Sequence, residues 1–79
     1  MAIRKVEAQV AGSVLAQSVG VGQHITQGTT IIVLECMKME IPHEAPCAGV
    51  VLWLEACAKT VEVGDVVATL DDEPAPSRP

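Results

Sequence analysis

The sequence has 79 residues, enough for one domain, and a formal net charge of -5 at pH 7. Its five basic residues form no cluster in the sequence, which argues against nucleic acid and against an anionic membrane surface as partners. No stretch is apolar enough to span a membrane, and the three cysteines have neither a disulfide-framework nor a metal-finger spacing. We therefore expect a reduced, cytoplasmic protein.

Most apolar residues are Val, Ile, Leu and Ala, a composition that favours strands, and no segment has the period of a helix. Alternation of polar and apolar residues between turn glycines predicts an all-β chain. The predicted strands lie near residues 3–9, 13–18, 24–26, 30–36, 39–44, 50–56, 60–62 and 66–71. The acidic, proline-rich end has no apolar face, so we expect one domain over residues 1–71 and a disordered tail over residues 72–79.

The chain contains an internal repeat. The segment EAQVAG at 7–12 recurs as EAPCAG at 44–49, and ITQG at 25–28 is echoed by VEVG at 61–64, one residue closer. The repeat predicts two like halves of about four short strands each, related by a pseudo-twofold axis. It also pairs apolar positions of the two halves, which we expect to face one core: Ile32, Leu34, Ala68 and Leu70.

One segment has no counterpart in the repeat. Residues 35–40 read ECMKME and lie between the halves, where a tight turn would expose Lys38 at its tip. Methionines on both sides present apolar surface to water, which is useful to a recognising partner and not to a core. A Met-Lys turn also accepts a conformational penalty at non-glycine positions, which indicates that something outside the fold selected these residues.

On position alone, Lys38 would be an ordinary solvated charge. A lysine that forms a Schiff base needs apolar burial or a neighbouring cation, whereas the nearest charges in the sequence are Glu35 and Glu40. We therefore expect no catalytic residue here. No set of residues has metal-ligand spacing, so we expect no metal site.

The segment 35–40 resembles the biotin-attachment motif of the biotin/lipoyl attachment family, in which a lysine between two methionines is biotinylated. The resemblance covers residues 6–71, and Met-Lys-Met is typical of biotinyl rather than lipoyl domains. One departure is Cys36, where the family usually has Ala or Ser. The implied fold is a flattened barrel or sandwich of two four-stranded antiparallel sheets, a barrel-sandwich hybrid, with the lysine on the connecting hairpin.

The resemblance implies a biotin carboxyl carrier, a non-catalytic subunit of a biotin-dependent carboxylase, decarboxylase or transcarboxylase. Biotin would be attached covalently to Lys38 by a biotin protein ligase, with Met37 and Met39 as contacts and Glu35 and Glu40 in ligase recognition. The carrier would move carboxylate between biotin carboxylase and carboxyltransferase, and the isolated domain is expected to be monomeric. The alternatives are a lipoyl carrier of a 2-oxo acid dehydrogenase or glycine-cleavage system, and an unmodified interaction module.

The remaining candidates have plain structural interpretations. His24 and His43 are expected to be surface or edge histidines rather than ligands, because no metal set accompanies them. Trp53, the only aromatic residue, is expected to pack in the core or face a partner. Cys47 and Cys57 are interpreted as small packing residues.

Overall fold

The computed structural model describes residues 2–72 as eight strands, with no helix in that range. In chain order the strands are β1 Ala2–Glu7, β2 Gly12–Gln17, β3 His24–Ile25, β4 Thr30–Cys36, β5 Met39–Glu44, β6 Gly49–Leu54, β7 Thr60–Val61 and β8 Val66–Asp72. All eight predicted strands are present, each end within two residues of its expected place. β8 includes Asp72, the first residue of the predicted tail, and the rest of that tail lies outside the described residues.

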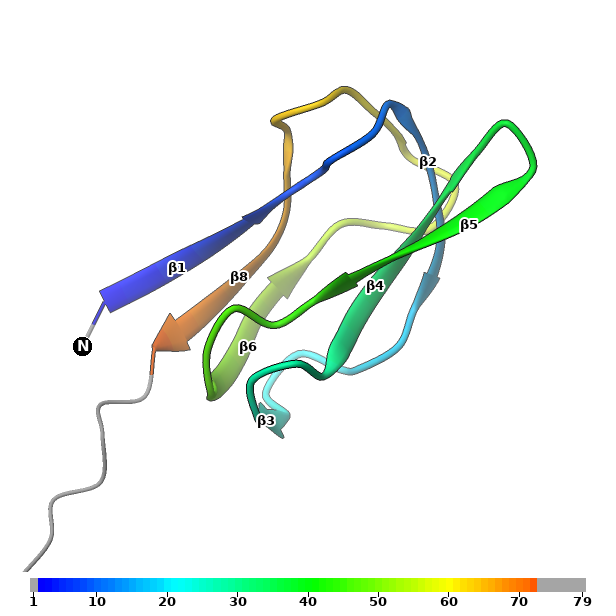
Figure 1. The fold of residues 1–79 in the computed structure, drawn as a ribbon. Coiled ribbons are helices and arrows are strands. Elements are labelled where there is room, and N and C mark those ends of the chain that lie inside the picture. The colour runs from blue at the N-terminus through cyan, green and yellow to red at the C-terminus, as the bar shows by residue number, and fades with distance from the viewer. Residues whose placement is uncertain (1, 73–79) are drawn as a thin grey trace, which may run out of the picture.

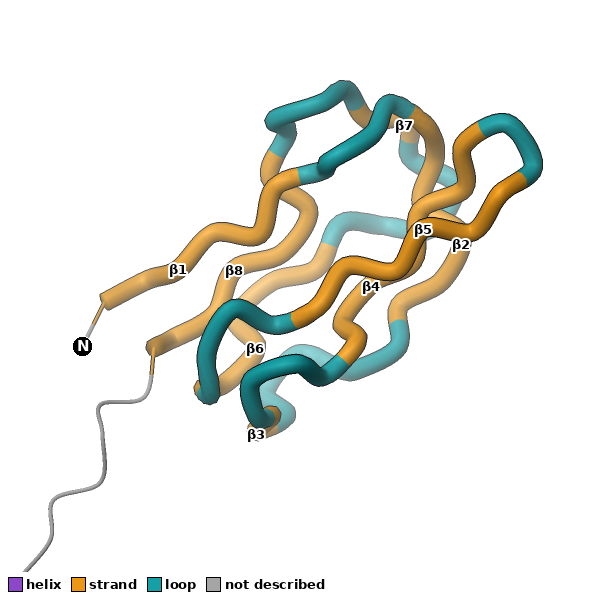
Figure 2. The backbone as a smooth tube through the Cα atoms, viewed as in Figure 1, coloured by secondary structure: helices purple, strands orange, loops and turns teal. Residues whose placement is uncertain are grey.

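The strands form two antiparallel four-stranded sheets, with the orders β1-β8-β6-β3 and β5-β4-β2-β7 (Figures 1 and 2). We call them the β1 sheet and the β5 sheet. Each takes two strands from each half of the repeat, so the halves interlock and neither contains a complete sheet. Both sheets are open at their edges, so the predicted fold is confirmed in its sandwich form. No helix long and apolar enough to cross a membrane occurs among residues 2–72.

The predicted pseudo-twofold symmetry is confirmed by strand order and by hydrogen bonding. Exchanging β1 with β5, β2 with β6, β3 with β7 and β4 with β8 converts one sheet order into the other. Backbone hydrogen bonds between the loops that connect the strands repeat as well. The Ala8 N–H donates to Asp65 O at 2.8 Å, and the equivalent Ala45 N–H donates to Thr29 O at 2.8 Å.

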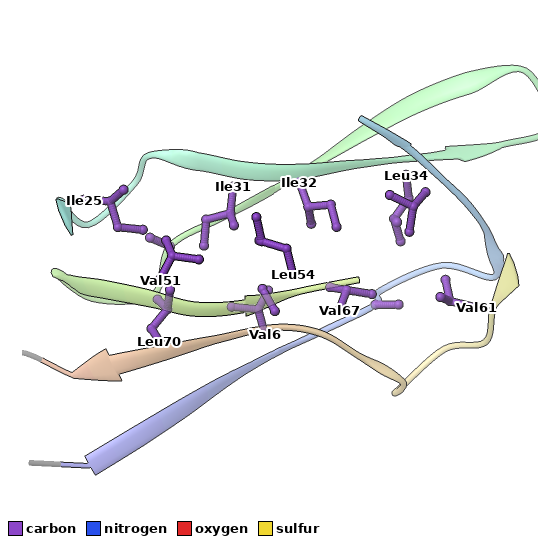
Figure 3. Close-up of a cluster of buried hydrophobic side chains, with 14 residues drawn as sticks. Val6, Ile25, Ile31, Ile32, Leu34, Val51, Leu54, Val61, Val67 and Leu70 are labelled. Atoms are coloured by element: carbon purple, nitrogen blue, oxygen red, sulfur yellow. The ribbon is translucent and has the colours of Figure 1, made fainter. Parts of the chain in front are cut away.

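The core lies between the sheets and draws on both (Figure 3). The four positions that the repeat predicted to face it, Ile32, Leu34, Ala68 and Leu70, are all 0% exposed. The buried hydrophobic side chains among the described residues are all aliphatic: Val, Ile, Leu and Ala. Burial of this apolar area is the main stabilising contribution in a domain of this size.

Bulges at equivalent places add residues to this core. Strict alternation would turn either Ile31 or Ile32 outward, yet both are 0% exposed. The register between β4 and β5 shifts between Thr30 and Ile32, so Ile31 is an extra residue in its strand. The same irregularity between β1 and β8 leaves Val67 and Ala68 both at 0% exposure. Two consecutive apolar residues thus face inward in each half.

Two glycines mark close approaches between strands. A Cβ on Gly12 would overlap the carbonyl oxygen of Glu35, and a Cβ on Gly49 would overlap that of Asp71. The two sites are equivalent under the pseudo-twofold axis. They place the beginning of β2 against the end of β4, next to the β4–β5 hairpin, and the beginning of β6 against the end of β8.

The single residue lost from the second half can be located from the backbone hydrogen bonds. They keep an offset of 37 residues up to the pair Ser18 and Glu55, and an offset of 36 from Gly20 and Ala56 onward. The residue without a counterpart is therefore Val19, at the start of the turn that follows β2. This agrees with the predicted loss between the matched blocks.

Candidate functional site: the hairpin between β4 and β5

The hairpin is closed by two residues, Met37 and Lys38, after the last cross-strand pair of Cys36 with Met39. Both turn residues have left-handed backbone, with φ of 52° at Met37 and 67° at Lys38. Two positive φ values in a two-residue hairpin define a type I′ turn, whose twist matches that of its strands. Asn-Gly is the favoured sequence there, because a residue with a Cβ pays about 1–2 kcal/mol for left-handed backbone. The predicted conformational penalty is therefore present at both positions.

The hairpin projects from the body of the sandwich at the end opposite the free ends of β1 and β8 (Figure 1). Those free ends are the pseudo-symmetric counterpart of the hairpin, since β8 corresponds to β4 and β1 to β5. At one end of the molecule a turn joins β4 to β5, whereas at the other end no turn joins the equivalent strands β8 and β1. The symmetry break expected from the repeat coincides with the projecting tip.

Alternation gives the hairpin two unlike faces. Leu34 is fully buried, so the positions two and five residues further, Cys36 and Met39, lie on the side that faces the other sheet. Glu35 and Glu40 are cross-strand partners on the outer side, and both are exposed. Like charges directly opposite each other are unfavourable for strand pairing. This carboxylate pair is thus a second feature of the hairpin that folding alone does not favour.

The side chains at the tip are open to solvent. Met37 is 90% exposed, Met39 is 64% exposed, and Lys38 is exposed. Among the described residues, the Lys38 ammonium forms no ion pair or hydrogen bond. A Schiff-base lysine requires burial or an adjacent cation, and this position provides neither. The geometry instead presents a free primary amine between two accessible thioethers.

His43 lies on β5, an edge strand of its sheet, which is one of its two expected places, but it is not at the surface. It is 4% exposed and faces the core from β5. Its Nε2 accepts the Gln9 N–H at 3.0 Å, and its Nδ1 lies 3.2 Å from the Ile41 carbonyl oxygen, which fits the neutral tautomer with its proton on Nδ1. The ring connects the hairpin strand to the loop between β1 and β2. The sequence signal was available in the repeat, where the counterpart of His43 is the buried Val6.

The far end of the sandwich holds a small polar cluster. The Arg4 guanidinium lies 3.4 Å from the Asp72 carboxylate, and both side chains are partly exposed. Burial raises the pKa of the Cys47 thiol, and the charge of Asp72 and its hydrogen bond to the thiol raise that pKa further. Cys47 packs against the core as expected, and the raised pKa favours its protonated thiol over the thiolate.

Three other candidates are on the surface. Cys57 is exposed, so its interpretation as a packing residue is wrong. His24 is exposed, as expected. Trp53 is 41% exposed on the outer side of the β1 sheet, where it pairs with Thr69, so of its two expected places the core is excluded. No group of three or more His, Cys, Asp or Glu side chains within residues 2–72 is placed to hold a metal ion.

Comparisons with known proteins agree with this geometry. The biotin/lipoyl family described as "Biotin-requiring enzyme" matches residues 4–70. The "Biotinylated protein TB7.3 homolog" of Mycobacterium leprae is 36% identical over 66 residues, which is 82% of this chain and 93% of that protein. The chain therefore belongs to the biotin/lipoyl attachment family.

Solved structures show where such a domain occurs. The urea carboxylase of Kluyveromyces lactis superposes with a TM-score of 0.85 and 26% identity over 90% of this chain. A single-chain, multi-domain long-chain acyl-CoA carboxylase superposes with a TM-score of 0.82 and 26% identity over 91% of it. The chain spans only 6% and 7% of those proteins. It is thus a biotinyl carrier domain, non-catalytic in itself, of a type found within carboxylases.

The family and the biotinylated relative support covalently attached biotin as the cofactor. The hairpin fits this group, because an amide to the exposed Lys38 amine displaces no contact among the described residues. Lys38 is exposed on the turn of a hairpin that projects from the sandwich (Figure 1). A second protein can therefore reach it from several directions.

Proposed function

We propose that Lys38 is the biotin attachment residue, loaded by a biotin protein ligase. The observation that carries this proposal is the type I′ turn, which holds two non-glycine residues at φ of 52° and 67° and leaves Lys38 exposed at the tip. A fold does not select such residues, so an external enzyme is the selecting agent.

In this role the domain supplies shape and access. An ordinary lysine amine is protonated at neutral pH, so the ligase must take up its proton before the Lys38 Nζ attacks an activated biotinyl carboxyl. Met37 and Met39 provide apolar contacts on either side of the amine. Glu35 and Glu40 offer the ligase a pair of carboxylates on the outer side of the same hairpin.

We further propose that the loaded domain serves a biotin-dependent carboxylase, decarboxylase or transcarboxylase in the cytoplasm. Biotin supplies the chemistry there, accepting carboxylate at a biotin carboxylase site and releasing it at a carboxyltransferase site. The chain's part is to hold the group on a short, projecting arm, which keeps it at high effective concentration for both sites. The carboxylase structures that share this fold support the proposal.

The test is coexpression of the full chain with a biotin protein ligase, followed by intact mass measurement. The wild-type mass should rise by one biotinyl group, and the formal net charge should fall from -5 to -6, visible on isoelectric focusing. Lys38→Arg should abolish both changes, whereas Lys5→Arg and Lys59→Arg should retain them. Modification that persists in Lys38→Arg would reject the site.

The same measurement separates the alternative functions. Coexpression with a lipoyl ligase should leave the mass unchanged. A lipoyl mass shift would indicate a carrier of a 2-oxo acid dehydrogenase or glycine-cleavage system. A chain that neither ligase modifies would be an interaction module.

A further inference from the structure

The two methionines that the structure describes lie on either side of Lys38. Of three methionines in the chain, Met37 and Met39 flank this lysine, and Met1 lies outside the described residues. Met37 is 90% exposed and Met39 is 64% exposed, although a methionine is an apolar, polarizable side chain well suited to a core. Exposure determines how readily a thioether is oxidised. Both sulfurs are therefore open to small oxidants in the surrounding water.

The fold does not need either methionine. Met37 occupies a left-handed position that Asn or Gly would fill at lower cost. In the repeat, Ala2 is the counterpart of Met39, so the equivalent strand of the other half begins with a small residue. Neither methionine belongs to the buried core cluster. Their apolar character is consequently available only to a partner that contacts the tip.

We propose that Met37 and Met39 form a sulfoxidation site that controls the loading of Lys38; the inference rests on the proposed attachment of biotin there. A peroxide, hydrogen peroxide in the simplest case, transfers one oxygen to the thioether sulfur. The sulfur loses two electrons to become the sulfoxide, and the peroxide is reduced to water. A thiol-dependent methionine sulfoxide reductase reverses the step, because its two thiols supply two electrons and two protons and the oxygen leaves as water.

The consequence for loading follows from polarity. A sulfoxide is a strong hydrogen-bond acceptor, and enclosing it in an apolar contact removes its water without replacement. The type I′ turn holds residues 37 and 38 in fixed backbone, so the altered side chain stays directly beside the amine that must enter the ligase. The domain itself stays folded, since both side chains lie outside the core. Oxidation thus changes recognition and leaves stability unaffected.

The experiment uses the unmodified full chain in a Cys36→Ser/Cys57→Ser background, which removes the half-buried thiol at the hairpin and the exposed thiol from the reaction. The protein is treated with hydrogen peroxide, the excess is destroyed with catalase, and oxygen addition at residues 37 and 39 is verified by peptide mass. Initial rates of biotinylation with ligase, ATP and biotin are then compared with the untreated sample. We expect a loss of about tenfold or more, the discrimination that an apolar site typically achieves. Treatment with methionine sulfoxide reductases should restore the rate.

The matched variant is Met37→Leu/Met39→Leu, compared only with its own untreated sample. Peroxide should leave its rate unchanged, because leucine has no sulfur to oxidise. Equal rates for oxidised and untreated wild-type hairpins would overturn the inference, as would an equal loss in the leucine variant. If the untreated chain accepts no biotin at all, the proposed function fails instead, so the two failures are distinguishable. Thermal unfolding of each sample should be the same before and after peroxide.

Discussion

The left-handed backbone at Lys38 predicts a separation of function from stability. Lys38→Gly should raise the free energy of unfolding by about 0.5–1 kcal/mol, because glycine avoids the left-handed penalty but loses more entropy on folding. It should also abolish biotinylation. Lys38→Arg should abolish biotinylation with unchanged stability. Urea unfolding of both variants, with an avidin blot, makes the comparison. A destabilised Lys38→Gly variant would show that Lys38 pays no conformational penalty in this turn.

The left-handed position outside the hairpin that is not a glycine, Ala58, tests the same conformational penalty. Ala58 has φ of 71° at the place that Gly22 occupies in the other half, where φ is 89°. Ala58→Gly should stabilise the domain by about 0.5–1 kcal/mol, and Gly22→Ala should destabilise it by a similar amount. A Cβ on Gly22 meets nothing within 4 Å, so the cost there is conformational alone. Denaturant midpoints measure both; the same sign for the two changes would contradict the assigned equivalence.

The His43 contact predicts a rescue between two residues. His43→Val copies Val6 from the other half but leaves the Gln9 N–H without an acceptor, which should cost about 1–3 kcal/mol. Adding Gln9→Pro copies Pro46, which has no N–H at the equivalent position, and should recover much of the loss. Unfolding free energies of the two single variants and the double variant form a cycle. Strictly additive losses would show that this hydrogen bond is not the coupling between the two sites.

At the scale of elements, the two close crossings should be the least tolerant positions of the sandwich. Gly12→Ala and Gly49→Ala each bring a Cβ onto a backbone carbonyl oxygen that cannot move without disturbing β4 or β8. We expect each to cost about 3 kcal/mol or more. Gly20→Ala is the control, since a Cβ there meets nothing within 4 Å and φ is not positive. Thermal unfolding should show a large loss of stability in Gly12→Ala and Gly49→Ala and a small one in Gly20→Ala. Equal losses in all three would contradict the close approach of the strands at Gly12 and Gly49.

The sequence predicted the elements well because the repeat constrains them twice. Turn glycines and alternation located all eight strands, and the matched positions 32, 34, 68 and 70 proved to be core. The bulges were not predicted, because an extra residue in one strand only appears once its partner's register is known. The burial of His43 was missed although the repeat signalled it, since the counterpart of His43 is the apolar Val6. Its acceptor role depends on Gln9, 34 residues away, which no local pattern reveals.

For the hairpin, sequence predicted the exposed tip, its conformational penalty and its place at the symmetry break. It did not predict that Glu35 and Glu40 are directly opposed on one face, or that Cys36 and Met39 share the other. Those relations follow from the two-residue turn, which fixes the register of β4 against β5. The chemical roles of the hairpin residues stay predictions from family resemblance.

At the scale of the whole molecule, the duplicated sandwich supports one projecting hairpin, which the proposed function makes its functional end. Both halves contribute strands to both sheets, so the hairpin is anchored by the entire core. Within residues 2–72, the opposite end carries the partly exposed Arg4–Asp72 pair and has no lysine on a turn. In the proposed function, delivery of the covalent group would depend on this single projecting turn.

The most direct measurement is tandem mass spectrometry of the protein purified from its own cells. The chain offers three lysine amines, Lys5, Lys38 and Lys59, all exposed, so accessibility alone does not choose among them. The type I′ tip predicts a biotinyl group on Lys38 and unmodified lysines at the other two positions. A biotinyl group on Lys5 or Lys59, or a native protein in which Lys38 carries no biotin, would contradict the account.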